Sequence, residues 1–215
     1  MTYLLQPKEL AYMAVNAFGA LQKPEEFYQL LELLAKHDKI SNILEVGVGN
    51  GGTSWALSKL NHLRNLIAID LPDGGWGGKA AEATGQSFGY IKNNSLADVH
   101  LILGNSQNAE CPAKVKELLG DEMLDFLFID GDHSYAGVKT DFLTYSPLVR
   151  KGGLIAFHDI CIHAPETGCE VHKFWQEIIG GILAEQTQKN EDQFHRLHKF
   201  TTEPTNWGGI GVIEW

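Results

Sequence analysis

Short runs of apolar residues recur along most of the chain, separated by longer segments of mixed character. The runs predict β-strands over residues 42–46, 65–69, 99–103, 124–129 and 153–157. The segments between them predict helices over residues 53–60, 87–97, 113–119, 135–148 and 170–179. Because strands that are apolar at nearly every position are buried on both faces, the pattern predicts a parallel sheet with helices on each side.

The two ends of the chain depart from this alternation. Residues 7–19 and 24–37 predict two helices before the first strand. At the other end, "HRLHKF" and "GIGVIEW" predict two strands with only a turn-rich connection, which indicates an antiparallel pair. We therefore expect an α/β fold with a doubly wound, Rossmann-like seven-stranded sheet. The sheet is expected to be mostly parallel with an antiparallel C-terminal strand, preceded by an N-terminal helical extension of residues 1–40.

Composition and charge narrow the class of protein. The chain has 215 residues, of which 44% are apolar and 20% charged, as in a globular domain. Its formal net charge of −10 argues against nucleic acid or an anionic membrane as a partner, since either favours a basic face. The three scattered cysteines indicate no disulfide framework, and neither a signal peptide nor a membrane-spanning run is evident. We expect a cytoplasmic protein with no nucleic-acid or membrane partner.

A glycine-rich turn follows the first predicted strand in "ILEVGVGNGG", residues 43–52. Gly47, Gly49 and Gly52 spell G-x-G-x-x-G, the dinucleotide fingerprint. Read from Glu45, the same turn spells E-x-G-x-G-x-G, the loop of S-adenosylmethionine (SAM) methyltransferases. The glycines suit either ligand, and so does Asp70 at the end of the second strand, because both ligands carry ribose hydroxyls.

Glu45 separates the two interpretations by charge. A carboxylate this close to the turn would repel a pyrophosphate, whereas it suits the ammonium and sulfonium groups of SAM. The first basic residue after the loop is Lys59, so no neighbour in the sequence offsets the charge. The alternative is that Glu45 is a helix-dipole or buried ion-pair partner beside an ordinary turn. The loop alone leaves both open.

Two later strands end in polar residues, in "FLFIDGDHSY" (126–135) and "GGLIAFHDI" (152–160). In open α/β sheets the ligand crevice lies outside the carboxyl ends of the strands, so these side chains should face the glycine loop. Asp130, His158 and Asp159 then offer ligands for a divalent cation, which would ease deprotonation of a substrate hydroxyl. His133 is placed to accept that proton. For Asp132 and the following Ser134 we expect a helix-capping role instead.

These segments together resemble class I SAM-dependent methyltransferases over residues 41–215. The resemblance is carried by "ILEVGVGNGG", "LIAIDLP", "LFIDGDHSYAGVKTDFLTYSPLVRKGGLIAFHD" and "WGGIGVIEW". The most similar subgroup includes metal-dependent macrolide-sugar O-methyltransferases and cephalosporin-hydroxylase-like proteins. The resemblance implies that residues 41–215 form a SAM-dependent methyltransferase domain. It implies cofactor contacts by Glu45, Gly47, Gly49, Asn50, Gly51, Asp70, Asn105, Ser106 and Asp130.

The same resemblance implies the roles of the polar cluster. Asp130 and Asp159 match metal-ligand positions, and His133 matches the proposed base. His158 departs from the pattern, because the related enzymes typically carry a carboxylate there. An imidazole makes the site softer, so Zn²⁺ or Mn²⁺ become alternatives to Mg²⁺.

The sequence thus favours a SAM-dependent O-methyltransferase that acts on a small-molecule acceptor with a divalent cation. A non-catalytic or regulatory SAM-binding protein is the main alternative, and an NAD-dependent oxidoreductase is disfavoured by Glu45 and the antiparallel tail. The N-terminal helices either cover the acceptor pocket or form the interface of a homo-oligomer.

Two further segments stay open. The glycine-rich connection of residues 73–90 is either a lid that carries Trp76 or a loop with no role. The segment "HDICIHAPETGCEVHKFW" (158–175) gathers histidines and cysteines, but their spacing matches no standard structural zinc pattern, so we do not expect a zinc site there.

Overall fold

The computed structural model describes residues 5–37, 39–189 and 197–215. Its helices are α1 (Pro7–Asn16), α2 (Pro24–Lys36), α3 (Gly52–Leu57), α4 (Ala81–Asn93), α5 (Glu110–Leu119), α6 (Tyr135–Tyr145) and α7 (Val171–Lys189). Its strands are β1 (Asn42–Val46), β2 (Asn65–Asp70), β3 (Asp98–Leu103), β4 (Leu124–Ile129), β5 (Val149–Phe157), β6 (Leu197–Phe200) and β7 (Ile210–Glu214). Two short 3-10 helices are η1 (Ser146–Leu148) and η2 (Pro165–Thr167).

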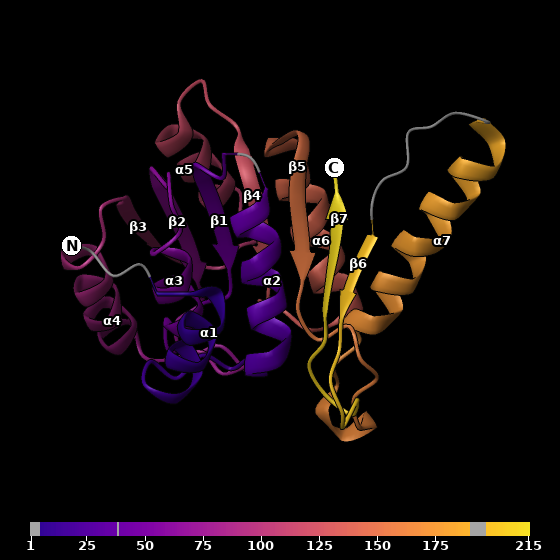
Figure 1. The fold of residues 1–215 in the computed structure, drawn as a ribbon, viewed down its shortest axis with the longest axis horizontal. Helices are drawn as coiled ribbons and strands as arrows, with labels where there is room; N and C mark the ends of the chain where they lie inside the picture. Colours follow the sequence, from indigo (N-terminus) through magenta and orange to yellow (C-terminus); the bar gives the residue numbers. More distant parts are fainter. Residues whose placement is uncertain (1–4, 38, 190–196) are drawn as a thin grey trace.

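The strands form one sheet in the order β3-β2-β1-β4-β5-β7-β6 (Figure 1). Strands β1 to β5 pair in parallel, while β7 lies antiparallel between β5 and β6. The predicted doubly wound sheet with an antiparallel C-terminal strand is thus confirmed. The strand order reverses between β1 and β4, so the carboxyl ends of these strands border the switch point where ligands bind in such sheets.

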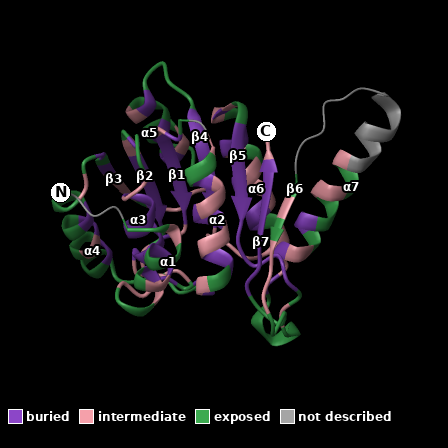
Figure 2. Ribbon diagram, viewed as in Figure 1, coloured by how far each residue is buried: buried purple, intermediate pink, exposed green. Residues whose placement is uncertain are grey.

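Helices cover both faces of the sheet, and the buried residues form two layers (Figure 2). One layer joins helices α1 to α4 to strand residues such as Ile43 and Phe126. The other joins helices α5 to α7 to strand residues such as Leu44 and Leu127. Because successive residues of a strand point to opposite faces, both faces stay covered only if nearly every position is apolar. This explains the largely apolar runs in the sequence.

The N-terminal extension packs into the same core as the sheet. Phe27, Leu30 and Leu31 of α2 are fully buried in the first layer. The chain before α2 approaches α3 so closely that a Cβ on Gly52 would lie 2.4 Å from the backbone nitrogen of Ala20. The described part of residues 1–40 therefore shares one hydrophobic core with the rest of the chain.

Two helices differ most from the predicted elements: α7 runs to Lys189, ten residues beyond the predicted end, and α4 begins earlier than predicted. We expected this helix to begin at Ser87, but it begins at Ala81. Its buried stripe of Thr84, Phe88 and Ile91 has helical spacing, which the intervening glycines obscured. The glycine-rich connection of residues 73–90 is therefore a loop only up to residue 80. Residues 195 and 196 of the predicted strand "HRLHKF" lie outside the described residues.

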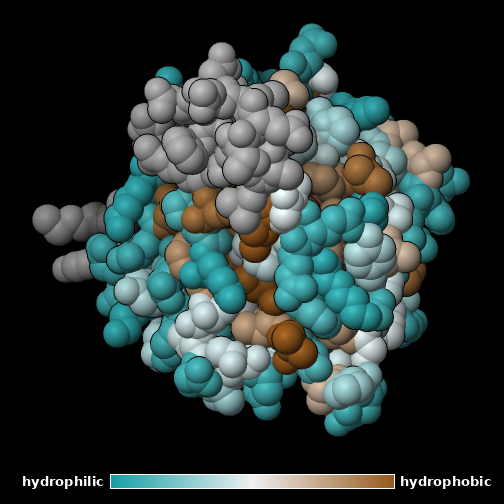
Figure 3. Space-filling view, turned by 90° about the vertical axis from the view of Figure 1, so that its right-hand side faces the viewer, coloured by the Kyte–Doolittle hydropathy of each residue, from teal (hydrophilic) through white to brown (hydrophobic). Residues whose placement is uncertain are grey.

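Within the described residues, no helix is long and apolar enough to cross a membrane. Figure 3 faces the side of the molecule where α7 and β6 lie, and a narrow strip of hydrophobic positions runs through a mostly hydrophilic surface. The homo-oligomer expected from the sequence stays a prediction.

Candidate functional site

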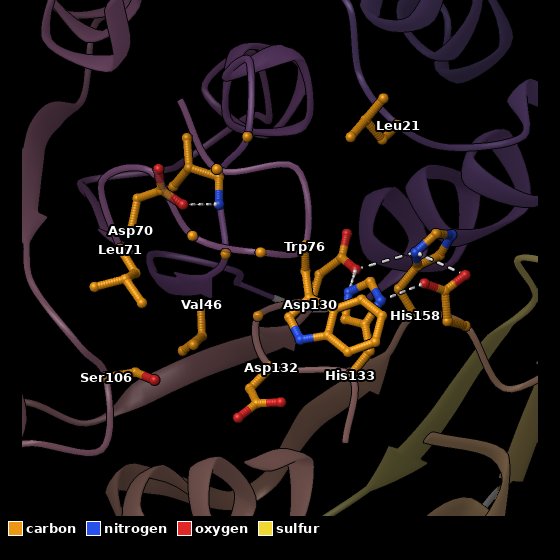
Figure 4. Close-up of a pocket in the computed structure, with 18 of the residues that line it drawn as sticks. Leu21, Val46, Asp70, Leu71, Trp76, Ser106, Asp130, Asp132, His133 and His158 are labelled. Carbon is orange, nitrogen blue, oxygen red and sulfur yellow. Dashed lines mark hydrogen bonds and ion pairs between the residues drawn. The ribbon is translucent and has the colours of Figure 1, made fainter. Parts of the chain in front are cut away.

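A pocket of about 520 Å³ opens at the carboxyl ends of β1, β2, β4 and β5 (Figure 4). The glycine loop after β1 forms one wall, and the segments after β4 and β5 form another. The pocket therefore lies at the switch point of the sheet, as the polar ends of the strands predicted. Asp130, Asp132, His133, His158 and Asp159 all line it, so the structure brings together every member of the predicted polar cluster.

The glycine loop passes so close to the end of β4 that position 47 has room only for glycine. The φ of Gly47 is +88°, a left-handed conformation, and a Cβ would lie 2.0 Å from the carbonyl oxygen of Asp130. The Gly47 N–H donates to the carbonyl of Ile69, at 2.9 Å. The first turn of the loop is thus fixed between β2 and the end of β4. Gly47, Val48 and Gly49 line the pocket.

Asp70 lies beside this loop with one carboxylate oxygen available. Its Oδ1 accepts a hydrogen bond from the Val48 N–H at 3.0 Å. Its Oδ2 is buried and makes no hydrogen bond of ordinary geometry to a described residue, although the Thr84 hydroxyl is near enough to lower the pKa of the group. Burial is the larger effect and raises this pKa. An orphaned acceptor of this kind fits a ribose hydroxyl.

Glu45 is buried in the core beside the glycine loop. Its side chain is 1% exposed, does not line the pocket and accepts a hydrogen bond from the Ser54 hydroxyl. Burial raises its pKa well above the usual value, so the neutral form is favoured. Because the Ser54 hydroxyl donates to Glu45, it does not cap α3, and this helix has no side-chain cap. Cofactor contact by Glu45 stays a prediction.

Asn50 and Gly51 also lie away from this pocket. They line a smaller hollow with Phe18 and Trp55, and the Asn50 amide donates to the carbonyl of Gly19 at 2.9 Å. Asn50 thereby fastens the glycine loop to the N-terminal extension. The structure gives Asn50 a structural contact, and the predicted cofactor contacts of Asn50 and Gly51 stay predictions.

Asn105 and Ser106 line the pocket on the side of β3. The Ser106 hydroxyl donates to Asp141 Oδ1 at 2.7 Å, and the Tyr145 hydroxyl donates to the Ser106 carbonyl at 2.6 Å. Burial raises the pKa of Asp141 to about 7, and the charge of Asp132 adds to this effect. Ser106 is therefore held by a buried carboxyl group beneath the pocket.

The raised pKa of Asp141 predicts a pH-dependent stability. The folded state holds this proton up to about pH 7, whereas the ordinary pKa of an aspartate side chain is 3.8. The stabilisation from the bound proton is therefore complete below about pH 4 and is lost as the pH rises through about 7. In Asp141→Asn the Ser106 bond has an acceptor at every pH. We expect urea unfolding to show that the variant gains up to about 4 kcal/mol over wild type between pH 4 and pH 8. A constant difference would contradict the assignment.

Asp130, His158 and Asp159 form the centre of the polar cluster (Figure 4). His158 Nδ1 lies 3.1 Å from Asp130 Oδ1 and 3.5 Å from Asp159 Oδ1. Burial disfavours the charges, but His158 holds the pKa of both carboxyl groups below the usual range. Burial likewise opposes protonation of His158, yet the two carboxylates raise its pKa well above the usual value. The cluster thus holds its charges by mutual pairing.

His133 bridges the two carboxylates. Its Nε2 lies 3.4 Å from Asp130 Oδ1, and its Nδ1 lies 3.1 Å from Asp159 Oδ2. Burial alone would lower its pKa, but hydrogen bonds with Asp130 and Cys169 and the carboxylate charges raise it to about 10. The Trp76 ring stacks on His133 at 4.8 Å between centroids. The glycine-rich loop therefore places Trp76 over the centre.

Sequence reasoning missed the contribution of Gln22 from the N-terminal extension. Its side chain is 3% exposed, and its amide donates to Asp130 Oδ2 at 2.8 Å. From the C-terminal end, the Gly208 N–H donates to Asp159 Oδ1 at 3.0 Å. Both contacts join residues far apart in the chain, and no local pattern marks either of them.

A buried ion pair connects these two contacts. Glu26 at the start of α2 accepts hydrogen bonds from the Thr202 N–H at 2.6 Å and the Gly209 N–H at 2.7 Å. Lys23 pairs with Glu26 at 3.5 Å and donates to the carbonyls of Thr202 and Pro204. The segment from Thr202 to Gly209 is thus fastened to α2, close to Gln22.

The donor set fits a divalent cation. Asp130 and Asp159 supply carboxylate oxygens and His158 an imidazole, and their ligand atoms lie within 4.8 Å of one another. Such mixed sets bind Mn²⁺ and Zn²⁺ as well as Mg²⁺. The Asp70 oxygen and the glycine loop, across the same pocket, fit the ribose and amino-acid parts of a nucleoside ligand.

Comparison with known proteins identifies the domain. The family described as a methyltransferase domain matches residues 44–160. An uncharacterised protein, R132, of Acanthamoeba polyphaga mimivirus is 28% identical over 193 residues, which are 83% of this chain and 79% of that protein.

Solved structures share the fold at low sequence identity. An O-methyltransferase from Bacillus cereus in complex with SAH has a TM-score of 0.58 at 18% identity, covering 98% of this chain and 90% of that one. TomG from Streptomyces achromogenes, involved in tomaymycin synthesis and in complex with SAM, gives 0.59 at 19%, covering 98% and 89%. MycE, from the mycinamycin biosynthetic pathway, in complex with Mg, SAH and mycinamycin VI, gives 0.64 at 18%, covering 99% of this chain but 55% of that one.

At these identities the solved structures establish the fold, whereas the family match spans more than half of the chain. The chain therefore belongs to the methyltransferase-domain family, and its fold is that of the class I SAM-dependent methyltransferases.

Proposed function

We propose that this protein transfers the methyl group of SAM to a hydroxyl group of a small molecule, assisted by a divalent cation at Asp130, His158 and Asp159. The observation that carries the proposal is the position of this cluster in one pocket with the glycine loop and Asp70. When bound, the cation would lower the pKa of a hydroxyl group in contact with it and offset the carboxylate charges around His133.

His133 is the proposed proton acceptor. In the transfer, the acceptor oxygen forms a bond to the methyl carbon, the carbon–sulfur bond breaks, and the hydroxyl proton passes to a nitrogen of His133. Both nitrogens of His133 face carboxylates, which orient the ring and stabilise the imidazolium that forms. Trp76 covers the ring and limits access of water.

The acceptor is proposed to enter between Trp76 and Trp207. Both indoles line the pocket and are 37% and 40% exposed. Beyond His133 the wall consists of His163, Thr167 and Cys169. Aromatic side chains with a few polar groups are typical of sites for small organic molecules. The cytoplasmic location and the homo-oligomer are likewise proposals.

A non-catalytic SAM-binding protein is the second candidate. The specific observation in its favour is the raised pKa of His133, about 10, because a histidine that holds its proton cannot accept another. In that case SAM would bind and no acceptor would be methylated with any divalent cation.

Calorimetric titration with SAM, SAH and NAD, followed by a methyl-transfer screen over small hydroxyl compounds, tests both candidates. We expect SAM and SAH to bind, NAD not to bind, and transfer to require a divalent cation such as Mg²⁺ or Mn²⁺. Tight NAD binding without SAM binding would refute the proposed function. SAM binding with no transfer across catechols, sugars and phenols would favour the non-catalytic candidate.

The contact of Gln22 with Asp130 predicts a weaker cation site in Gln22→Ala. Loss of the amide donor leaves Asp130 Oδ2 without this partner, and such supporting contacts change cation affinity by about 10-fold or more. Titration of the full chain with Mn²⁺ measures the change. Gln29→Ala is the matched control, since the Gln29 amide bonds to the Glu25 carbonyl within α2. Equal Mn²⁺ affinities in the two variants would contradict the role of Gln22.

A further inference from the structure

Asp159 lies near nitrogen atoms of two histidines, His133 and His163, that are not ligands of the proposed catalytic cation. Its Oδ2 lies 3.1 Å from His133 Nδ1, and its Oδ1 lies 3.2 Å from His163 Nε2. Asp159 also has a φ of +60°, a strained conformation for a residue with a side chain. The backbone strain and the donors together mark Asp159 as the focus of the centre.

Cys169 adds a thiol to the same place. Its sulfur, a ring nitrogen of His133 and a carboxylate oxygen of Asp159 all lie within 4.8 Å of one another. The thiol lies close enough to the His133 ring to raise the pKa of that histidine, is largely buried and lines the pocket. The Cys169 N–H donates to the Thr167 hydroxyl at 3.2 Å, which fixes the residue between η2 and α7.

The other two cysteines differ in this respect. Cys111 and Cys161 are free and buried. Among the described residues, neither belongs to a group of potential metal ligands, whereas Cys169 does. The position of Cys169 is thus specific to the centre and is not a general property of cysteines in this fold.

The chemistry of the two donor sets is different. Asp130, His158 and Asp159 supply mainly oxygen, which hard cations such as Mg²⁺ and Mn²⁺ accept. His133, Asp159 and Cys169 supply nitrogen, oxygen and sulfur, one of each, and thiolate ligands select Zn²⁺ and Co²⁺ over Mg²⁺. The sets share Asp159, whose Oδ2 faces His133 and whose Oδ1 faces His158, so an ion in the second set contacts a ligand of the first.

We propose that His133, Asp159 and Cys169 form a second, inhibitory cation site that is selective for thiophilic ions such as Zn²⁺. Binding releases the thiol proton to solvent and engages a lone pair of His133. His133 then cannot accept a proton from the acceptor, so occupancy of this site excludes methyl transfer. The inhibitory effect rests on the proposed function, whereas the binding does not.

Titration of the full, metal-free protein with Co²⁺ tests the binding. We expect a thiolate-to-cobalt charge-transfer band in the near ultraviolet that saturates at about one equivalent and disappears on addition of Zn²⁺. The band should be absent in Cys169→Ser and present in Cys161→Ser, with folding of each variant checked by circular dichroism. No band in the wild type, or a band that persists in Cys169→Ser, would overturn the site.

Inhibition is tested with an acceptor from the hydroxyl screen. We expect Zn²⁺ to inhibit transfer supported by Mg²⁺, and the Zn²⁺ concentration for half-inhibition to rise by about 10-fold or more in Cys169→Ser. Equal inhibition of both proteins would overturn the inhibitory role. A cobalt band in a protein that does not bind SAH would refute the proposed function and leave the cation site intact. SAH binding without the cobalt band would refute the second cation site and leave the proposed function intact.

Discussion

Asp130→Asn is expected to lower methyl transfer by at least about 10²-fold while SAM affinity stays within about threefold. The substitution keeps the shape of the side chain and removes one of the two carboxylate charges that hold His133 and His158. The cation site would lose an oxygen ligand, and the proton acceptor would lose half of its orienting contacts. Single-turnover rates with the acceptor, together with calorimetry of SAM, measure the two effects separately.

Asp98→Asn is the control for this substitution. Asp98 is the exposed first residue of β3. It lies at the amino end of the strand, whereas the pocket lies at the carboxyl ends of the parallel strands. We expect its transfer rate to match that of the wild type. An Asp130→Asn protein with an unchanged rate would exclude the proposed cation site, and one that no longer binds SAM would place Asp130 mainly in cofactor binding.

Gly47→Ala is expected to destabilise the fold by about 3 kcal/mol or more and to abolish SAM binding. The new methyl group would overlap the Asp130 carbonyl, which is backbone and cannot move aside as a flexible side chain does. Relief of the clash would separate the ends of β1 and β4. Urea unfolding and SAM calorimetry give both quantities.

Gly85→Ala provides the contrasting case. A Cβ at Gly85 has no neighbour within 4 Å, and the residue lies inside α4. We expect this variant to be as stable as wild type or more stable by up to about 1 kcal/mol, because alanine favours a helix. If both glycine variants had the same stability, the close contact at Gly47 would not be the reason for glycine there.

The sheet could be predicted from the sequence because its strands are buried on both faces. That burial forces apolar runs such as 42–46 and 124–129, and the observed strands have these bounds. The polar ends of β4 and β5 were equally predictable, since parallel strands bring their carboxyl ends to one edge. Ser134 caps α6 as expected, accepting a hydrogen bond from the Gly137 N–H at 3.0 Å.

Residues whose role depends on three-dimensional contacts were harder to predict. The charge argument for Glu45 considered an ionised carboxylate, but Ser54 and the surrounding core bury the group and burial raises its pKa. Gln22 reaches Asp130 across 108 positions of sequence, so no periodicity or local motif reports it. The start of α4 was not predicted because glycine usually indicates a loop, although a helix packed against a core tolerates it.

The fastening of the segment from Thr202 to Gly209 to Glu26 bears on how the protein matures. During synthesis the chain up to β5 can assemble its parallel strands as they leave the ribosome, since each pairs with strands already made. The backbone donors Thr202 and Gly209 of Glu26, and Gly208 of Asp159, become available only when residues 202–209 have emerged. The parallel part of the sheet can therefore form before the polar centre has all of its backbone contacts.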